Sequence, residues 1–236
     1  MNNLVSNSQS ISKALNRLLN RFGVYLLRTK NYSKIVNPGP LHLLEKYGME
    51  PRSVLHIGGH YAEEANEYKS AGIDKATFIE GDPKVFATMM QNLLKFPEYR
   101  GSCHLLSDHI GKEDFYVASN NGASSSLLAP DQHLLLEPQI HFDSPIQLPV
   151  VTLDSLDVGQ FDLIVLDVQG AEKLVINGGK KTFNNALALW VEVSAGALYL
   201  GNTQPSDLIN LLSPEFTPVY LNMGDKFWGD MLFVKK

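Results

Sequence analysis

The sequence predicts an α/β domain in which a mostly parallel β-sheet is flanked by helices. Two observations predict it: after a break at residues 37–40, short apolar segments alternate with segments of helical periodicity, and two strand-like runs follow one another closely near the C-terminal end. With 236 residues, 44% of them hydrophobic, the chain can bury one substantial core. We therefore expect one main domain over residues 37–236, preceded by a helical extension over residues 1–36.

Five strands are expected in the alternating part of the chain. They cover residues 53–57, 76–80, 104–107, 161–166 and 187–193. Residues 63–71 and 83–94 have the helical periodicity of crossovers, which connect the first strand to the second and the second to the third. Such crossovers are needed because parallel strands cannot be joined by a tight turn.

The last two strand-like runs, residues 216–221 and 230–234, are joined by a segment too short for a crossover helix. We therefore expect them to form an antiparallel pair. A mostly parallel sheet that ends in an antiparallel hairpin is typical of Rossmann-like methyltransferases, whereas dinucleotide-dependent dehydrogenases usually continue with parallel units.

Two regions lie outside the regular alternation. An insertion at about residues 114–153 contains a polar loop at 119–126 between strand-like residues 115–118 and 148–153, and an interruption of this length usually serves a function. The N-terminal extension has apolar residues at helical spacing, namely Ile11, Leu15, Leu18, Leu19 and Phe22. An amphipathic helix is expected there, which either packs on the main domain or covers a substrate pocket or a dimer interface.

Charge and composition exclude several classes of partner. The formal net charge is -5 and lysine and arginine do not cluster, which argues against nucleic acid and favours a small or neutral polar acceptor. The single cysteine, Cys103, cannot form an internal disulfide, and no cysteine and histidine spacing indicates zinc. Residues 1–12 lack the pattern of a secretory signal, and no apolar run approaches the roughly 20 residues that span a bilayer. We expect a cytoplasmic protein without a membrane span.

A glycine turn follows the first predicted strand, with Gly58 and Gly59 at its centre. Glycine lets the backbone approach a ligand closely, although His60 and Ala62 stand where a dinucleotide fingerprint would have glycines. Glu80 ends the second strand about 20 positions later, where a carboxylate can accept hydrogen bonds from both ribose hydroxyls. The pair predicts a site for a nucleoside cofactor; the alternatives are an ordinary tight turn and a solvated acidic strand end.

Acidic residues also follow the fourth and fifth predicted strands. Asp167 comes directly after residues 161–166, with Glu172 shortly beyond it, and Glu192 lies near the end of the fifth strand. Ligands of open α/β sheets bind outside the carboxyl ends of the strands, so these side chains should meet at one crevice. Asp167 and Glu192 are our candidate catalytic residues, as general bases that accept a hydroxyl proton; the alternative for each is a helix cap or a structural hydrogen bond.

Other side chains are weaker candidates for the same site. The histidines His60, His109 and His141 are alternative general bases. Ser124 and Ser125 lie in a loop rich in hydroxyls and amides that suits a polyhydroxylated acceptor, unless that loop is merely solvated. No metal is expected, because no second acid and amide pair follows the fifth strand.

Six segments of the main domain carry a more specific signal when they are taken in order. Residues 56–60, 78–83, 106–108, 121–127, 151–154 and 164–172 read HIGGH, FIEGDP, LSD, NGASSSL, VTLD and IVLDVQGAE. In that order they resemble the FkbM family of methyltransferases. The resemblance covers about residues 50–235 and leaves the N-terminal extension unmatched.

The resemblance implies the Rossmann-like class I methyltransferase fold, with a mostly parallel seven-stranded sheet, and S-adenosylmethionine as the cofactor. It implies these cofactor contacts: Gly58, Gly59 and His60 near the methionine portion, Glu80 on the ribose, and Ser107 and Asp108 near the adenine. It favours a pocket-lining role for Ser124 and Ser125, which with Glu172 after the fourth strand are our candidates for contacts with the acceptor. The sequence departs from the family pattern at His56, Ala62 and Gln169, where Asp, Gly and an acid are common.

The sequence therefore predicts an O-methyltransferase that acts on a hydroxyl of a sugar, a glycan precursor or a secondary metabolite. The alternatives are an NAD-linked oxidoreductase and a catalytically silent protein that binds a nucleoside and acts as a scaffold. The expected partner is a small molecule or a glycan, and a homo-oligomer stays open.

Overall fold

The computed structural model describes residues 38–223 and 227–236, and the chain divides into two units, residues 1–47 and 48–236. Helix α3 (Pro40–Lys46) belongs to the first unit. The amphipathic helix expected in the N-terminal extension lies outside the described residues.

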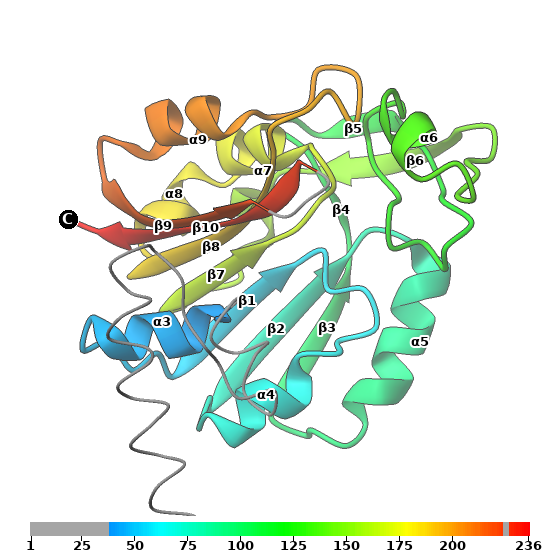
Figure 1. Cartoon of the computed structure of the whole chain (residues 1–236). Helices are drawn as coiled ribbons and strands as arrows, with labels where there is room; N and C mark the ends of the chain where they lie inside the picture. Colours follow the sequence, from blue (N-terminus) through cyan, green and yellow to red (C-terminus); the bar gives the residue numbers. More distant parts are fainter. Residues whose placement is uncertain (1–37, 224–226) are drawn as a thin grey trace, which may run out of the picture. The chain divides into compact units, whose positions relative to one another are not determined.

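A seven-stranded sheet forms the centre of the second unit (Figure 1). Its strands are β1 (Ser53–Ile57), β2 (Lys75–Glu80), β3 (Tyr99–Cys103), β7 (Leu163–Leu166), β8 (Ala188–Ser194), β9 (Phe216–Met223) and β10 (Trp228–Lys235). The spatial order is β3-β2-β1-β7-β8-β10-β9. The first five of these strands run parallel, and β10 pairs antiparallel with both β8 and β9. The predicted parallel sheet with a C-terminal antiparallel hairpin is confirmed.

Helices cover both faces of this sheet (Figure 1). The crossover helices α4 (Ala65–Ser70) and α5 (Pro83–Leu93) lie on one face, and α7 (Glu172–Gly178), α8 (Lys180–Asn184) and α9 (Pro205–Leu212) lie on the other. The sequence specifies the start of α5 locally. Asp82 caps it by accepting hydrogen bonds from the backbone N–H groups of Lys84 and Val85, and Pro83 occupies its first turn.

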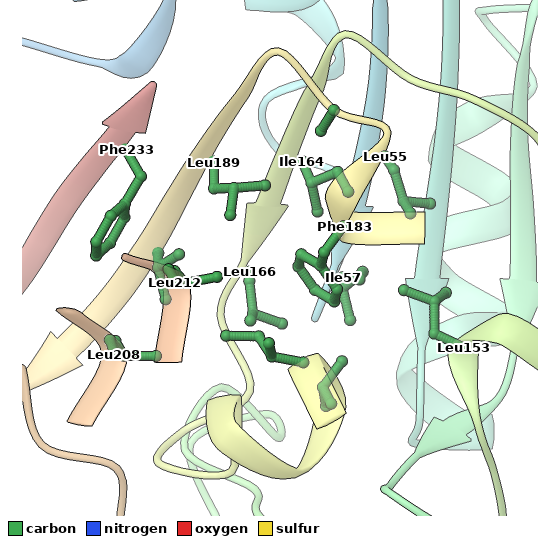
Figure 2. Close-up of a cluster of buried hydrophobic side chains, with 14 of the residues drawn as sticks. Leu55, Ile57, Leu153, Ile164, Leu166, Phe183, Leu189, Leu208, Leu212 and Phe233 are labelled. Carbon is green, nitrogen blue, oxygen red and sulfur yellow. The ribbon is translucent and has the colours of Figure 1, made fainter. Parts of the chain in front are cut away.

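The strands at the centre of the sheet are apolar because both of their faces are covered. In β1, Leu55 and Ile57 point toward α7, α8 and α9, whereas His56 on the opposite face contacts Tyr68 of α4. All four residues of β7 are buried. Figure 2 shows how the side chains of the main core interlock between the sheet and the helices, among them Phe183 of α8.

The third strand differs from the prediction. Residues 104–107 were expected to form it, but the strand is β3, at residues 99–103, and Leu105–Leu106 forms a short strand, β4, of a second sheet. Because β3 pairs only with β2 at the edge of the sheet, it tolerates Arg100 and Gly101 in its centre and shows no apolar pattern.

The second sheet lies within and beside the expected insertion. It has three strands, β4, β5 (Gly111–Phe115) and β6 (Ile146–Val151), in the order β4-β6-β5. Between β5 and β6 the chain forms the short helix α6 (His133–Leu136), and the 3-10 helix η3 (Leu153–Leu156) follows β6. The described helices include none with the length and apolar character to cross a membrane.

Two neighbouring residues of α9 test the core. Leu208 is fully buried and belongs to the core cluster, whereas Ile209 is 36% exposed. We expect Leu208→Ala to lower the free energy of unfolding by about 2–5 kcal/mol, because it removes buried apolar contacts and leaves a cavity. The matched change Ile209→Ala should cost less than about 1 kcal/mol. Urea unfolding followed by circular dichroism measures both, and equal losses would contradict the assignment of the buried face.

Candidate active site

The turn after β1 depends on Gly58. Its φ of 80° is in the left-handed region, and a Cβ atom there would lie 1.6 Å from the backbone oxygen of Asp167. The backbone N–H of Asp167 donates to the Ile57 carbonyl oxygen at 2.9 Å. This hydrogen bond lies just past the last paired residues of β1 and β7 and keeps the two chain segments close together there. A glycine is therefore required where the two central strands end, and it sets the Asp167 backbone directly against the turn.

Glu80 lies beside that turn at the end of β2. Its Oε2 accepts a hydrogen bond from the backbone N–H of His60 at 2.9 Å, and its Oε1 accepts one from the backbone N–H of Asp82 at 2.8 Å. Burial raises the pKa of Glu80 above its ordinary value. Each carboxylate oxygen is thus fixed by one N–H and keeps a lone pair for another donor. The structure brings the predicted glycine turn and the predicted carboxylate together.

His60 connects the turn to the loop at residues 119–126. Its Nδ1 lies 2.8 Å from Glu63 Oε1, and its Nε2 lies 3.1 Å from the backbone oxygen of Asn121. Burial lowers the pKa of His60, but the hydrogen bonds to Glu63 and Asn121 outweigh it and the net pKa is raised. Both ring nitrogens face acceptors, so the protonated ring, which has two donors, fits this position.

A first cavity of about 310 Å³ opens between the turn, Glu80 and this loop. Its wall combines acidic residues near the turn with apolar residues from the second sheet. The lining consists of His56, Ile57, Gly58, Gly59, His60, Glu63, Glu64, Ile79, Glu80, Gly81, His104, Leu105, Leu106, Phe115, Gly122, Ala123, Ser125, Ser126, Leu127, Asp167, Val168, Gln169 and Ala171. Of the predicted cofactor residues, Gly58, Gly59, His60 and Glu80 are present.

Two residues expected near the adenine do not line this cavity. Ser107 is fully buried, and its hydroxyl donates to Glu113 Oε1 at 2.6 Å. Asp108 is exposed, and its Oδ1 lies 3.0 Å from Nδ1 of His109. Leu105 and Leu106 supply the wall in their place.

A second cavity of about 400 Å³ adjoins the first. It shares Ala123, Asp167 and Gln169 with the first cavity. The remaining lining residues are Asn120, Ser124, His133, Glu137, Ile140, Gly170, Glu172, Glu192, Val193, Ser194, Leu198, Tyr199 and Trp228. The predicted catalytic pair therefore meets here, and the loop at 119–126 faces both cavities, with Ser125 on the first and Ser124 on the second.

The amide of Gln169 bridges the two candidate catalytic carboxyls. Its Nε2 donates to Asp167 Oδ1 at 2.7 Å and to Glu192 Oε2 at 2.7 Å. Burial raises the pKa of Glu192 well above its ordinary value, and the nearby Asp167 carboxyl raises it further. Both effects favour the protonated form of the Glu192 carboxyl.

Two more carboxyls surround this pair. Glu172 is buried and accepts a hydrogen bond from the backbone N–H of Gly170 at 2.9 Å, and burial raises its pKa to about 7. Asp230 lies opposite Glu192 in the pairing of β10 with β8, and burial raises its pKa to about 6. Carboxyls so close together repel one another's charge, which favours a partly protonated cluster.

The sequence did not indicate Tyr199 or His133, both of which line the second cavity. The Tyr199 hydroxyl lies 2.8 Å from the Ser124 carbonyl oxygen and 3.1 Å from Gln169 Oε1. Tyr199 follows the carboxyl end of β8, and that position was an available signal. His133 is buried, and its Nδ1 has no hydrogen-bond partner. It comes from the insertion, where no periodic pattern marked it.

The alternative general bases are not equally placed. His60 lines the first cavity, whereas His109 and His141 are exposed and line neither cavity. Within residues 38–223 and 227–236, no group of three or more histidine, cysteine, aspartate or glutamate side chains is arranged to hold a metal ion.

Comparison with known proteins identifies the family. Residues 56–227 match the methyltransferase FkbM domain. The 2-O-methyltransferase NoeI of Sinorhizobium fredii (strain NBRC 101917 / NGR234) is 30% identical over 174 residues, which are 69% of this chain and 71% of that protein. Magnesium protoporphyrin IX methyltransferase (ChlM) from Synechocystis PCC 6803, solved with bound S-adenosylmethionine, matches with a TM-score of 0.51 at 12% identity, covering 97% of this chain and 96% of that one. This similarity shows a shared Rossmann-like fold. The chain belongs to the FkbM methyltransferase family.

Proposed function

We propose that this protein is an O-methyltransferase that uses S-adenosylmethionine to methylate a hydroxyl of a sugar, a glycan precursor or a secondary metabolite. The observation that carries the proposal is the meeting of two cavities at Asp167 and Gln169, one with the features of a nucleoside site and the other with buried carboxyls. The name of the relative NoeI, a 2-O-methyltransferase, supports oxygen as the atom that is methylated.

The first cavity suits S-adenosylmethionine in its lining residues and in its charge. Glu80 presents two fixed oxygens to ribose hydroxyls, and Leu105 and Leu106 offer an apolar wall for the adenine. Glu63, Glu64, Glu80 and Asp167 line it, and among the described residues of its wall none is a lysine or arginine. A sulfonium cation is favoured in such surroundings, whereas the two phosphates of a dinucleotide would be repelled. The charge therefore argues against the NAD-linked alternative.

The second cavity fits an uncharged, polyhydroxylated acceptor. Asn120 and Ser124 offer hydrogen bonds to hydroxyls, and the lining residues that the structure describes again include no lysine or arginine to neutralise a phosphate or carboxylate. An acceptor there lies across the shared wall from the first cavity. Proximity and alignment of this kind supply much of the rate of a group transfer.

Asp167 is the group best placed to accept the proton of the acceptor hydroxyl. When bound, S-adenosylmethionine supplies a methyl group activated by the positive sulfur. Asp167 lines both cavities, and its Oδ1 is held by the Gln169 amide. The raised pKa of the neighbouring Glu192 favours its protonated form, which places less negative charge beside the base than an ionised carboxylate would.

The cofactor assignment predicts a loss of affinity in Glu80→Ala. We expect the Kd for S-adenosylmethionine in titration calorimetry to rise at least about tenfold, because hydrogen bonds to a charged group are lost. The Kd of the unchanged protein should also rise as the pH falls through the raised pKa of Glu80, because the ionised carboxylate accepts the ribose hydrogen bonds. Glu67→Gln, an exposed change on α4, is the control. An unchanged Kd in Glu80→Ala, or tighter binding of NAD than of S-adenosylmethionine, would contradict the assignment.

The catalytic assignment predicts a loss of turnover in Asp167→Asn. We expect kcat to fall about 100-fold or more, the usual contribution of a general base, while S-adenosylmethionine still binds. The measurement uses S-adenosylmethionine with a labelled methyl group and a panel of methyl glycosides and cell-extract metabolites, with mass spectrometry of the products. Asp157→Asn, an exposed change after η3, should keep full turnover. Binding of the cofactor without a labelled product from any acceptor would favour the silent scaffold instead.

A further inference from the structure

Gln169 occupies the wall that separates the two cavities, and its backbone is held in an uncommon conformation. Its φ of 53° lies in the left-handed region, which a side chain other than glycine adopts at a cost. The Ser126 hydroxyl donates to the Gln169 carbonyl oxygen at 2.8 Å, which ties this peptide to the loop at 119–126. The fold therefore sustains a strained position that aims a long amide side chain at the site.

Both ends of that amide have partners. The Nε2 atom donates one hydrogen bond to Asp167 Oδ1 and one to Glu192 Oε2, each at 2.7 Å, which uses both of its protons. The Oε1 atom lies 3.1 Å from the Tyr199 hydroxyl. The reversed amide would lose the two hydrogen bonds that Nε2 donates and would set its oxygen against the Asp167 carboxyl. Tyr199 and the two carboxyls thus fix the amide in one orientation.

We propose that Gln169 is a positioning residue for methyl transfer: its amide clamps Asp167 and Glu192 side by side at the shared wall, so that Asp167 meets the acceptor hydroxyl in a fixed orientation. This inference rests on the proposed function and deepens it. In this proposal Gln169 acts without touching the cofactor or the acceptor. The orientation of the Asp167 carboxyl depends on the hydrogen bond that the neutral Gln169 amide donates to it.

The surrounding charges explain why a neutral donor suits this position. The ionisable groups around the pair are Glu172 of α7, Asp230 of β10, Tyr199 after β8, Glu64 and His56 near the turn, and His133 and Glu137 on the wall of the second cavity. Burial lowers the pKa of His56 to about 4 and also lowers that of His133, which disfavours the cationic form of both rings. His60, on the wall of the first cavity, contacts Glu63 and Asn121 instead of the pair. An amide supplies two hydrogen bonds to the pair at any pH, whereas a carboxyl group at the same place would need a proton to supply one.

Two variants of Gln169 separate the clamp from a merely structural role. Gln169→Gly removes the amide and suits the left-handed backbone, so the protein should fold. We expect its kcat to fall about 100-fold, while the Kd for S-adenosylmethionine changes less than about threefold. Gln169→Glu keeps the length of the side chain but needs a proton to bridge the pair. Its kcat should therefore decline toward high pH, where three neighbouring carboxylates repel one another, in a range where the unchanged protein keeps its activity.

Gln147→Glu is the matched control, because Gln147 is exposed on β6 and its amide donates to Asp114 outside both cavities. Its pH profile should superimpose on that of the unchanged protein. The rates are measured with whichever methyl glycoside of the panel above is turned over. A Gln169→Gly variant with kcat within about threefold of the unchanged protein, or a Gln169→Glu variant with an unshifted pH profile, would overturn the proposal.

A measurement without acceptor keeps this test separate from the proposed function. The carboxyl carbon of Glu192 is followed by NMR in protein labelled at glutamate, with Glu192→Gln to assign the signal. In Gln169→Glu the apparent pKa of Glu192 should rise by about one unit or more, because a carboxylate replaces the amide that contacts it, and Gln147→Glu should leave it unchanged. An unchanged titration in Gln169→Glu would refute the contact on which the clamp depends, whether or not any acceptor is methylated.

Discussion

The close approach of β1 and β7 at the end of the sheet is the constraint on which the site depends. Gly58 leaves room for the Asp167 backbone at a distance that any Cβ atom would block, and the hydrogen bond between the two strand ends maintains it. This contact places the turn, which borders the first cavity, next to Asp167, which borders both. The cofactor side and the acceptor side of the proposed reaction meet because two central parallel strands end at the same level.

The second feature that shapes the site is a set of acidic residues around the two cavities, whose described lining residues include no lysine or arginine. Carboxyl groups line both cavities, and four of them have neutral donors as partners: backbone N–H groups for Glu80 and Glu172, and the Gln169 amide for Asp167 and Glu192. Glu63 differs, because it faces the ring of His60. Burial and mutual repulsion raise the pKa values of several of these groups. Their repulsion is therefore reduced by protonation and not by pairing with lysine or arginine. Such surroundings favour a cationic cofactor and an acceptor without negative charge, which is the selectivity that we propose.

The accuracy of the sequence predictions follows the burial of each element. β1 and β7 are apolar because helices cover both of their faces, and their positions were predicted closely. β3 was placed too late in the chain, because an edge strand can hold Arg100 and Gly101 and the neighbouring apolar run belongs to β4. In the site, Gly58 and Glu80 were predictable because their backbone and charge requirements are local to strand ends. The bridging role of Gln169 was not, because two of its partners, Glu192 of β8 and Tyr199 in the loop after β8, lie far from it in the sequence.

The sequence by itself determined the alternation of strands and helices, the antiparallel end of the sheet, the family, and the strand ends that carry the glycines and acids. These features depend on periodicity, turn chemistry and residue type, which involve only residues that are close together in the sequence. Only the tertiary structure decided that the loop at 119–126 faces two cavities, that Ser107 and Asp108 lie outside their walls, and that one amide joins Asp167 to Glu192. Hydrogen bonds and pKa shifts between residues far apart in sequence arise only when packing brings the side chains together and removes water from them.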